Sequence, residues 1–74
     1  MAVDTQAFIT ELQQYGTVDF CDINNEKSYI VVMSNYTADE ATFLSLANTY
    51  LIQDYPNQVA FTIADNVLKT EYFK

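Results

Sequence analysis

Hydrophobic side chains recur at helical spacing in an early segment of the chain. The apolar positions of this segment are Phe8, Ile9, Leu12 and Tyr15. Intervals of three and four residues place side chains on one face of a helix. Asp4 precedes the segment as a helix N-cap, and Gly16 follows it as a stop signal. We therefore predict a first helix over about residues 5–15.

A second helix is predicted by a capping signal followed by a broad apolar stripe. Thr37 and Glu40 have the spacing of a capping box, in which each side chain bonds the backbone amide of the other residue. The stripe consists of Phe43, Leu44, Leu46, Ala47, Tyr50 and Leu51. Pro56 then requires the helix to have ended, because proline removes a backbone donor.

Two segments between these helices have the composition of β-strands. Residues 17–23 alternate and are rich in β-formers, and residues 29–34 read Tyr-Ile-Val-Val-Met-Ser. Residues 24–27 separate them with two asparagines, which tolerate left-handed backbone conformations, and two charged side chains. We predict a β-hairpin.

A second hairpin is predicted after Pro56. Val59, Phe61 and Ile63 alternate with polar or small residues, as in a half-buried strand. Asp65-Asn66 is a candidate two-residue turn, after which residues 67–73 return as a fourth strand. A short C-terminal helix over residues 68–73 is the alternative interpretation.

The predicted elements give the order α-β-β-α-β-β. We expect residues 1–74 to form a single acidic α+β domain, a four-stranded antiparallel sheet with two helices packed on one face. Tyr15 and Tyr50 are expected in the core, and Tyr36 and Tyr55 at the surface.

The strand over residues 29–34 is apolar on both faces, whereas a sheet covered on one side normally has one polar face. Two helices cover only one face. The other should expose part of this strand together with either Cys21 and Ile23 or Val18 and Phe20, and such patches mark interfaces. We assign a self-associating sheet face, and a possible homodimer, to five residues: Cys21, Ile23, Tyr29, Val31 and Met33.

Charge is the strongest compositional feature of the chain. Ten carboxylates face three lysines and no arginine, for a formal net charge of −7. Direct binding to nucleic acid or to an anionic membrane is therefore not expected, because both depend on Lys and Arg contacts. A basic protein partner is favoured, although the charge serves only solubility in the alternative view. The candidate partner-binding carboxylates are Glu11, Asp19, Asp22, Glu26, Asp39 and Glu40.

Catalytic and metal chemistry is not indicated. Without histidine, neither Ser-His nor Cys-His nucleophiles are available, and the single cysteine cannot complete a tetrahedral metal site. Cys21 has no cationic neighbour in sequence that would lower its pKa, so we expect an inert thiol. A phosphate-binding loop is not indicated, since Gly16 is the only glycine. We predict a non-enzyme with no cofactor and no metal.

The sequence also indicates a compartment. Neither a secretory signal nor an apolar run long enough to span a bilayer is apparent. A lone cysteine fits a reducing interior. We expect a cytoplasmic protein, in the host cytoplasm if it is viral.

Two hypotheses of function follow. The first is an inhibitor from a phage or mobile element, of the anti-defence type that includes anti-CRISPR candidates. It would act as a DNA mimic, presenting carboxylates in place of phosphates to a basic protein that handles nucleic acid. The alternative is a small homo-oligomeric structural or assembly subunit with no inhibitory role.

Overall fold

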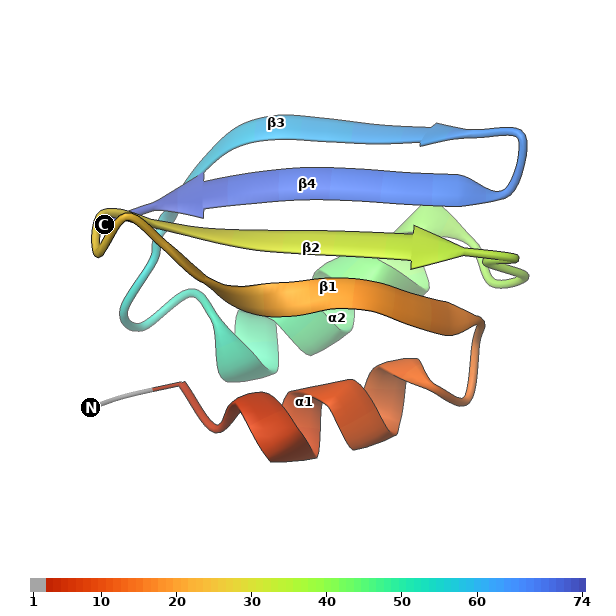
Figure 1. The fold of residues 1–74 in the computed structure, drawn as a ribbon, viewed down its shortest axis with the longest axis horizontal. Helices are drawn as coiled ribbons and strands as arrows, with labels where there is room; N and C mark the ends of the chain where they lie inside the picture. The colour runs from red at the N-terminus through yellow and green to blue at the C-terminus, as the bar shows by residue number, and fades with distance from the viewer. Residues whose placement is uncertain (1–2) are drawn as a thin grey trace.

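The computed structural model describes residues 3–74, which form two helices and one four-stranded sheet in the order α-β-β-α-β-β (Figure 1). The elements are α1 (Thr5–Leu12), β1 (Thr17–Asn24), β2 (Ser28–Ser34), α2 (Glu40–Tyr50), β3 (Asn57–Ala64) and β4 (Val67–Phe73). The predicted α+β class and element order are confirmed.

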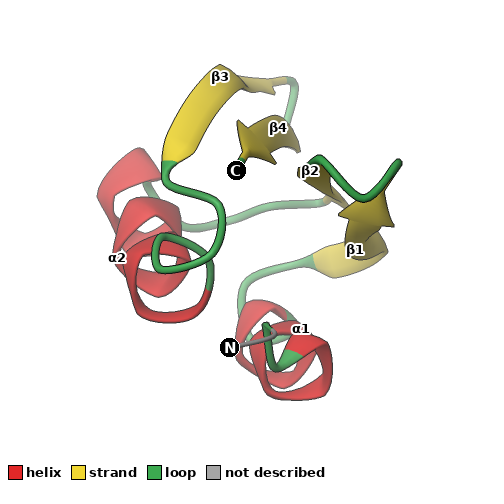
Figure 2. Cartoon of the chain, turned by 90° about the vertical axis from the view of Figure 1, so that its left-hand side faces the viewer, coloured by secondary structure: helices red, strands yellow, loops and turns green. Residues whose placement is uncertain are grey.

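The strand order in the sheet is β1-β2-β4-β3, and every neighbouring pair is antiparallel. β2 and β4 are therefore central, whereas β1 and β3 are edge strands. Both helices lie on the same side of the sheet, which curves around them (Figure 2). One face of the sheet is left without a covering helix, and we call it the open face.

α1 is shorter than predicted. It ends at Leu12, and residues 13–15 form a turn before β1. The predicted N-cap is confirmed, because the Asp4 carboxylate accepts a hydrogen bond of 3.1 Å from the amide of Ala7. Gly16 does not directly stop the helix. A Cβ at Gly16 would lie 2.9 Å from the Ser34 carbonyl oxygen, so the missing side chain lets the chain pass the end of β2.

The capping box predicted for α2 is wrong by two residues. Asp39 is the N-cap, and its Oδ1 accepts hydrogen bonds from the amide and the hydroxyl of Thr42, at 2.9 and 2.6 Å. Thr37 is drawn away by the neighbouring chain, since its amide and hydroxyl both donate to the Tyr15 carbonyl oxygen. The helix consequently starts at Glu40.

Both hairpins close through residues in the left-handed backbone region. Asn25 and Glu26 have φ values of 58° and 62°, and Asp65 and Asn66 have values of 53° and 63°. In the β3–β4 connection, where Ala64 pairs with Val67, two successive positive φ values are the signature of a two-residue type I′ turn, whose twist matches that of the paired strands. The β1–β2 connection is one residue longer, since Asn24 pairs with Ser28. The fourth strand is thus confirmed over Val67–Phe73, and the alternative of a C-terminal helix is wrong.

The core lies between the sheet and the helices and is rich in aromatic rings. Phe8 stacks on Tyr50 with ring centroids 5.2 Å apart, and Phe43 stacks on Phe61 at 5.7 Å. Tyr36 and Tyr55 were predicted at the surface, but only 2% and 3% of each is exposed. Tyr15 and Tyr50 are instead half-buried.

The polar tip of Tyr36 explains how this ring can be buried. Its hydroxyl donates to the Asp39 carbonyl oxygen at 2.7 Å, so burial leaves no unsatisfied donor. The ring thereby joins the β2–α2 loop to the start of α2.

The predicted self-associating face is corrected by the structure. Tyr29, Val31 and Met33 are fully buried beneath the helices, and Cys21 is 6% exposed. Ile23 pairs with Tyr29, so it lies on the same, covered side, although it remains exposed at the sheet edge. All five residues therefore belong to the helix-covered face of the sheet, and the opposite side of β2 belongs to the open face.

Candidate functional site

The open face carries two rows of side chains that cross all four strands. The first row runs through Phe20, Val32, Lys69 and Thr62, which are paired in that order across the sheet. The second row runs through Asp22, Ile30, Glu71 and Ala60 in the same way. An apolar pair on β2 therefore lies beside an oppositely charged pair on β4.

A bulge in β1 determines which of its side chains reach this face. Val18 pairs with Met33 and Phe20 pairs with Val32, so Asp19 is an extra residue between them. Val18 consequently shares the covered face with Met33, and Phe20, which is 45% exposed, shares the open face with Val32.

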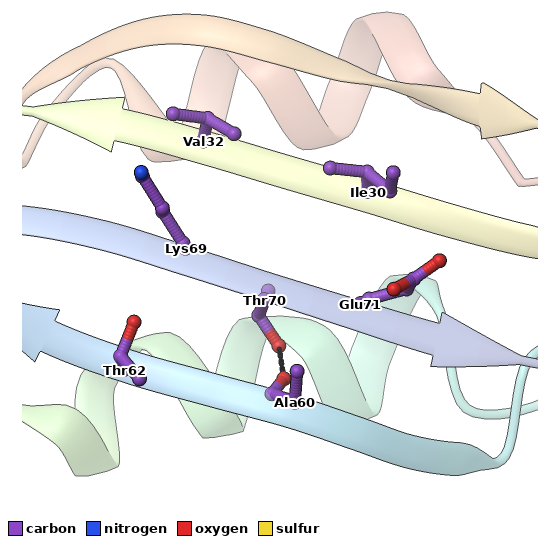
Figure 3. A pocket seen from close by; sticks show the side chains of 7 residues that line it. All are labelled: Ile30, Val32, Ala60, Thr62, Lys69, Thr70 and Glu71. Carbon is purple, nitrogen blue, oxygen red and sulfur yellow. Dashed lines mark hydrogen bonds between the residues drawn. The ribbon is translucent and has the colours of Figure 1, made fainter.

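A shallow hollow of about 310 Å³ lies on the open face. Figure 3 shows Ile30 and Val32 of β2 together with Lys69 and Glu71 of β4 around it, with the Lys69 side chain leaning toward β2. Its floor includes Thr70, whose hydroxyl donates to the Ala60 carbonyl oxygen at 2.7 Å. A second hollow of about 300 Å³ shares Thr62 and Lys69 with the first. The face is thus uneven and has room for side chains of another molecule.

A different surface gathers carboxylates at one end of the molecule. The α1–β1 turn, the β2–α2 loop and the β3–β4 turn all meet there (Figure 1). Two backbone hydrogen bonds hold the three segments together, from the amide of Thr37 to the Tyr15 oxygen and from the amide of Tyr36 to the Asn66 oxygen, at 2.9 and 2.8 Å. We call this surface the acidic end, and its carboxylates are Glu11, Asp19, Asp39, Glu40 and Asp65.

Two of the three lysines lie at the end of the molecule opposite the acidic end. Lys27 is in the β1–β2 turn, and its carbonyl oxygen accepts a hydrogen bond of 3.1 Å from the amide of Lys74. Lys27 and Lys74 therefore both lie at the end opposite the acidic end. Lys69 is on the open face, paired with Val32. It shares a hollow with Asp65, so one lysine faces the five carboxylates of the acidic end.

Asp39 is the carboxylate of this end that is held most firmly. The Thr42 hydroxyl, and then the Thr42 amide, hold the pKa of Asp39 below its ordinary value, because both donate to its charged form. Its position at the start of α2 also favours negative charge. Asp39 lines a hollow of about 360 Å³ with Tyr15 and the first turns of α2. A carboxylate accepts about four hydrogen bonds, so Asp39 retains capacity for a donor that enters this hollow.

Glu11 is placed where helix stability does not favour it. It lies in the last turn of α1, whose negative dipole end disfavours a carboxylate, and that turn contains no basic residue. Gln14 donates a hydrogen bond of 2.8 Å to its Oε1 and orients it. Its charge therefore adds to the acidic end without stabilising the helix.

The structure divides the six predicted partner-binding carboxylates. Glu11, Asp19, Asp39 and Glu40 lie toward the acidic end, whereas Asp22 lies on the open face and Glu26 in the opposite turn. Asp65 was missed, although its turn was predicted correctly. The position of this turn beside the β2–α2 loop follows from the strand order of the sheet, which the sequence pattern does not reveal.

The thiol of Cys21 makes a buried polar contact with the hydroxyl of Tyr29 in the core. The Tyr29 hydroxyl lies 3.4 Å from the Cys21 sulfur and 2.7 Å from the Thr5 hydroxyl. Burial raises the pKa of the Cys21 thiol, so the thiolate that nucleophilic chemistry needs is disfavoured. The contact satisfies polar groups that the fold has buried.

Residues 3–74 contain neither a metal-binding cluster nor a helix that could span a membrane. No three side chains of the His, Cys, Asp or Glu types are grouped so as to hold a metal ion. No helix in this range has both the length and the apolar character needed to cross a bilayer.

Comparison with known proteins gives no relative. No protein-family model, no curated protein and no solved structure matches this chain.

Proposed function

We propose that this chain is a small protein-binding module that uses its acidic end to occupy the basic surface of a protein that handles nucleic acid. The observation that carries the proposal is the gathering of Glu11, Asp19, Asp39, Glu40 and Asp65 at one end, while Lys27 and Lys74 lie at the opposite end. Carboxylates in such a group meet the same Lys and Arg side chains that bind DNA phosphates.

The backbone framework of the acidic end supports a rigid contact. Asp39 begins a helix, Asp65 sits in a type I′ turn, and hydrogen bonds join the connecting segments. Because little conformational freedom is lost on binding, the charges are presented at low entropic cost. A compact acidic body of this kind is suited to inhibition by mimicry, as in the anti-defence proteins of phages.

The hollow beside Asp39 suggests how a single basic side chain would be held. An Arg or Lys of the partner would enter between Tyr15 and α2 and donate to the Asp39 carboxylate. The Tyr15 ring offers such a cation a π surface. Glu40, at the start of the same helix, adds attraction at longer range.

The experiment is affinity capture from a bacterial lysate, followed by competition. The immobilised protein should retain basic proteins at low salt and release them as salt rises, because exposed charge pairs are screened. A short DNA duplex should compete with the immobilised protein for each captured protein. Capture of acidic or neutral proteins, or retention that is insensitive to salt, would contradict the proposal.

Matched variants locate the binding surface. Asp19→Asn, Asp39→Asn and Asp65→Asn together remove three charges from the acidic end. Asparagine still caps a helix and tolerates a left-handed turn, so the fold is preserved. We expect affinity for the captured protein to fall at least about tenfold at low salt.

The control removes three charges elsewhere, by Asp4→Asn, Asp22→Asn and Glu26→Gln. We expect less than about a threefold loss, because these positions face away from the proposed contact. Equal losses in the two variants would show that net charge, rather than the acidic end, determines binding.

A further inference from the structure

The charges of the open face are arranged so that the face complements itself. Lys69 and Glu71 are two residues apart on β4, so their side chains emerge on the same side of the sheet. Val32 and Ile30 occupy the matching positions on β2, as their pairing with Lys69 and Glu71 shows. β2 and β4 are the two central strands.

We propose that two copies of this chain associate through their open faces, with Lys69 of each copy paired to Glu71 of the other. The two-fold axis of this dimer lies in the interface, runs across the strands and passes between the two rows of side chains. Rotation about it places the first row of one copy over the second row of the other. Lys69 then meets Glu71, and Val32 meets Ile30, twice in each dimer.

The geometry of sheet packing places these four contacts where the match is closest. Face-to-face sheets cross at about 30°, so strands near the centre of the interface stay in register while the edge strands diverge. β2 and β4 are near this centre. Phe20 and Asp22, on the edge strand β1, lie at the rim, where Asp22 remains solvated.

The hollow gives the apolar side chains of a second copy a place to pack. Ala60 and Thr62 are small, and the space above them measures about 310 Å³. Ile30 and Val32 are already half-buried. Close approach of a second copy is enough to remove their remaining apolar surface from water.

A second copy fits this face better than the basic partner proposed for the acidic end. Lys69 would repel a basic surface, whereas a partner with alternating charges in the same spacing satisfies both Lys69 and Glu71. The chain itself has that pattern. The strand directions are reversed by the axis, so the acidic ends of the two copies point away from each other and remain free.

The area of the open face limits the affinity expected for the dimer. The molecule measures 30 × 22 × 20 Å. One whole face therefore amounts to roughly 600 Å², the lower limit of about 600 Å² per partner for specific complexes. We expect a dissociation constant on the order of micromolar.

The dimer is tested with variants whose charges at positions 69 and 71 are exchanged, measured by sedimentation equilibrium over a wide concentration range. Lys69→Glu and Glu71→Lys should each weaken association at least about tenfold, because each creates two like-charge contacts in the dimer. The double variant with both substitutions recreates both pairs in reverse, so it should recover the dimer.

The control Lys27→Glu makes the same change in charge in the β1–β2 turn, and it should leave association unchanged. All substituted side chains are at least partly exposed, and circular dichroism verifies that each variant is folded. A monomer at every concentration would overturn the proposal. So would a dimer that persists in both single variants, or a double variant that stays monomeric.

These outcomes are independent of the function proposed for the acidic end. Sedimentation uses the purified chain alone, and neither Lys69 nor Glu71 belongs to the acidic end. Failure of lysate capture would therefore leave the dimer standing, and a monomeric protein would leave capture by the acidic end standing.

Discussion

Gly16 shows how closely two backbone segments approach at the acidic end. A methyl group at this position would lie within 3.1 Å of three backbone atoms, in Ser34, Asn35 and Tyr36. Backbone atoms cannot rotate away as side-chain ends can, so a larger residue must displace the β2–α2 loop. The single glycine of the chain is therefore used for proximity rather than for a left-handed conformation.

We predict that Gly16→Ala destabilises the protein by about 1–3 kcal/mol, the usual cost of overpacking a tight site. Urea unfolding followed by circular dichroism measures this as a lower midpoint with an unchanged slope. The neighbouring variant Thr17→Ala is the control. Thr17 is exposed, and its substitution should change stability by less than about 0.5 kcal/mol.

Glu26 is the least favourable residue for its backbone conformation. It has a φ of 62° in the β1–β2 turn, whereas the other described residues with positive φ are all asparagine or aspartate, types that tolerate such values: Asn25, Asn35, Asp65 and Asn66. Glutamate has no short polar group that compensates for the crowding of its Cβ. The turn therefore stores strain at this residue.

We predict that Glu26→Gly stabilises the protein by about 0.5–1 kcal/mol, since glycine adopts a positive φ without crowding of a Cβ, and this relief outweighs the greater entropy that glycine loses on folding. Thermal unfolding should show an increase in Tm of several degrees. Glu26→Gln separates strain from charge because it retains the Cβ. An equal gain from Glu26→Gln would show that charge, and not backbone strain, is the cause.

At the scale of single elements, the hairpins were predicted well because their signals are local. Asp65-Asn66 tolerates the left-handed region, and the strand that follows ends at Phe73 as predicted. Helix ends depend on more distant groups. Thr37 has the right spacing for a cap, but the carbonyl oxygen of Tyr15, 22 residues away, takes its hydroxyl instead.

We predict that Asp39→Ala lowers the unfolding midpoint, because it leaves the first amides of α2 without their acceptor, whereas Asp39→Asn retains most of the stability. The Glu40→Gln variant should have almost no effect, since Asp39 and not a Thr37–Glu40 box caps the helix. A loss in Glu40→Gln as large as that in Asp39→Ala would contradict this assignment.

The Asp39 cap also has a pH dependence of known sign. The pKa of Asp39 is lower in the folded protein, so its contribution to stability is present above the ordinary pKa of 3.8 and is lost as the pH falls through the folded value. The difference in stability between the protein and Asp39→Ala should therefore narrow in acid.

The open face illustrates a limit of periodicity within an element. β2 is apolar at every position from Tyr29 to Met33, so alternation does not reveal which side the helices cover. Asp19 adds a bulge that places Val18 and Phe20 on opposite faces. Cys21 and Ile23 lie on one face as expected, but the expectation that Val18 and Phe20 share a face is wrong, because the bulge separates them.

At the scale of the whole molecule, net charge was readable from composition, but its distribution was not. Asp19, Asp22 and Glu26 are close in sequence, yet they are spread along the length of β1 and the turn that follows it. Asp39 and Asp65 are distant in sequence, and the topology brings their segments to one end. The site therefore emerges only when the strand order is known.

Burial of several phenols makes the whole molecule sensitive to alkaline pH. Burial raises the pKa of Tyr29, Tyr36 and Tyr72 above the ordinary value of 10.0, and it raises that of Cys21 above 9.0. Above those ordinary values the unfolded chain loses protons that the folded protein still holds. The free energy of unfolding then decreases as the pH rises.

We predict that stability is nearly constant between about pH 5 and pH 9 and falls progressively above pH 9, as the buried groups approach their raised pKa values. Tyr29→Phe should cost about 1 kcal/mol near neutral pH, because the hydroxyls of Tyr29 and Thr5 bond each other at 2.7 Å. It should also make the alkaline decline shallower. Thr5→Ala breaks the same hydrogen bond and keeps the phenol, so it should lower stability near neutral pH and leave the decline at least as steep. Urea midpoints across this pH range distinguish the two variants, and parallel declines in both would mean that ionisation of Tyr29 does not drive alkaline unfolding.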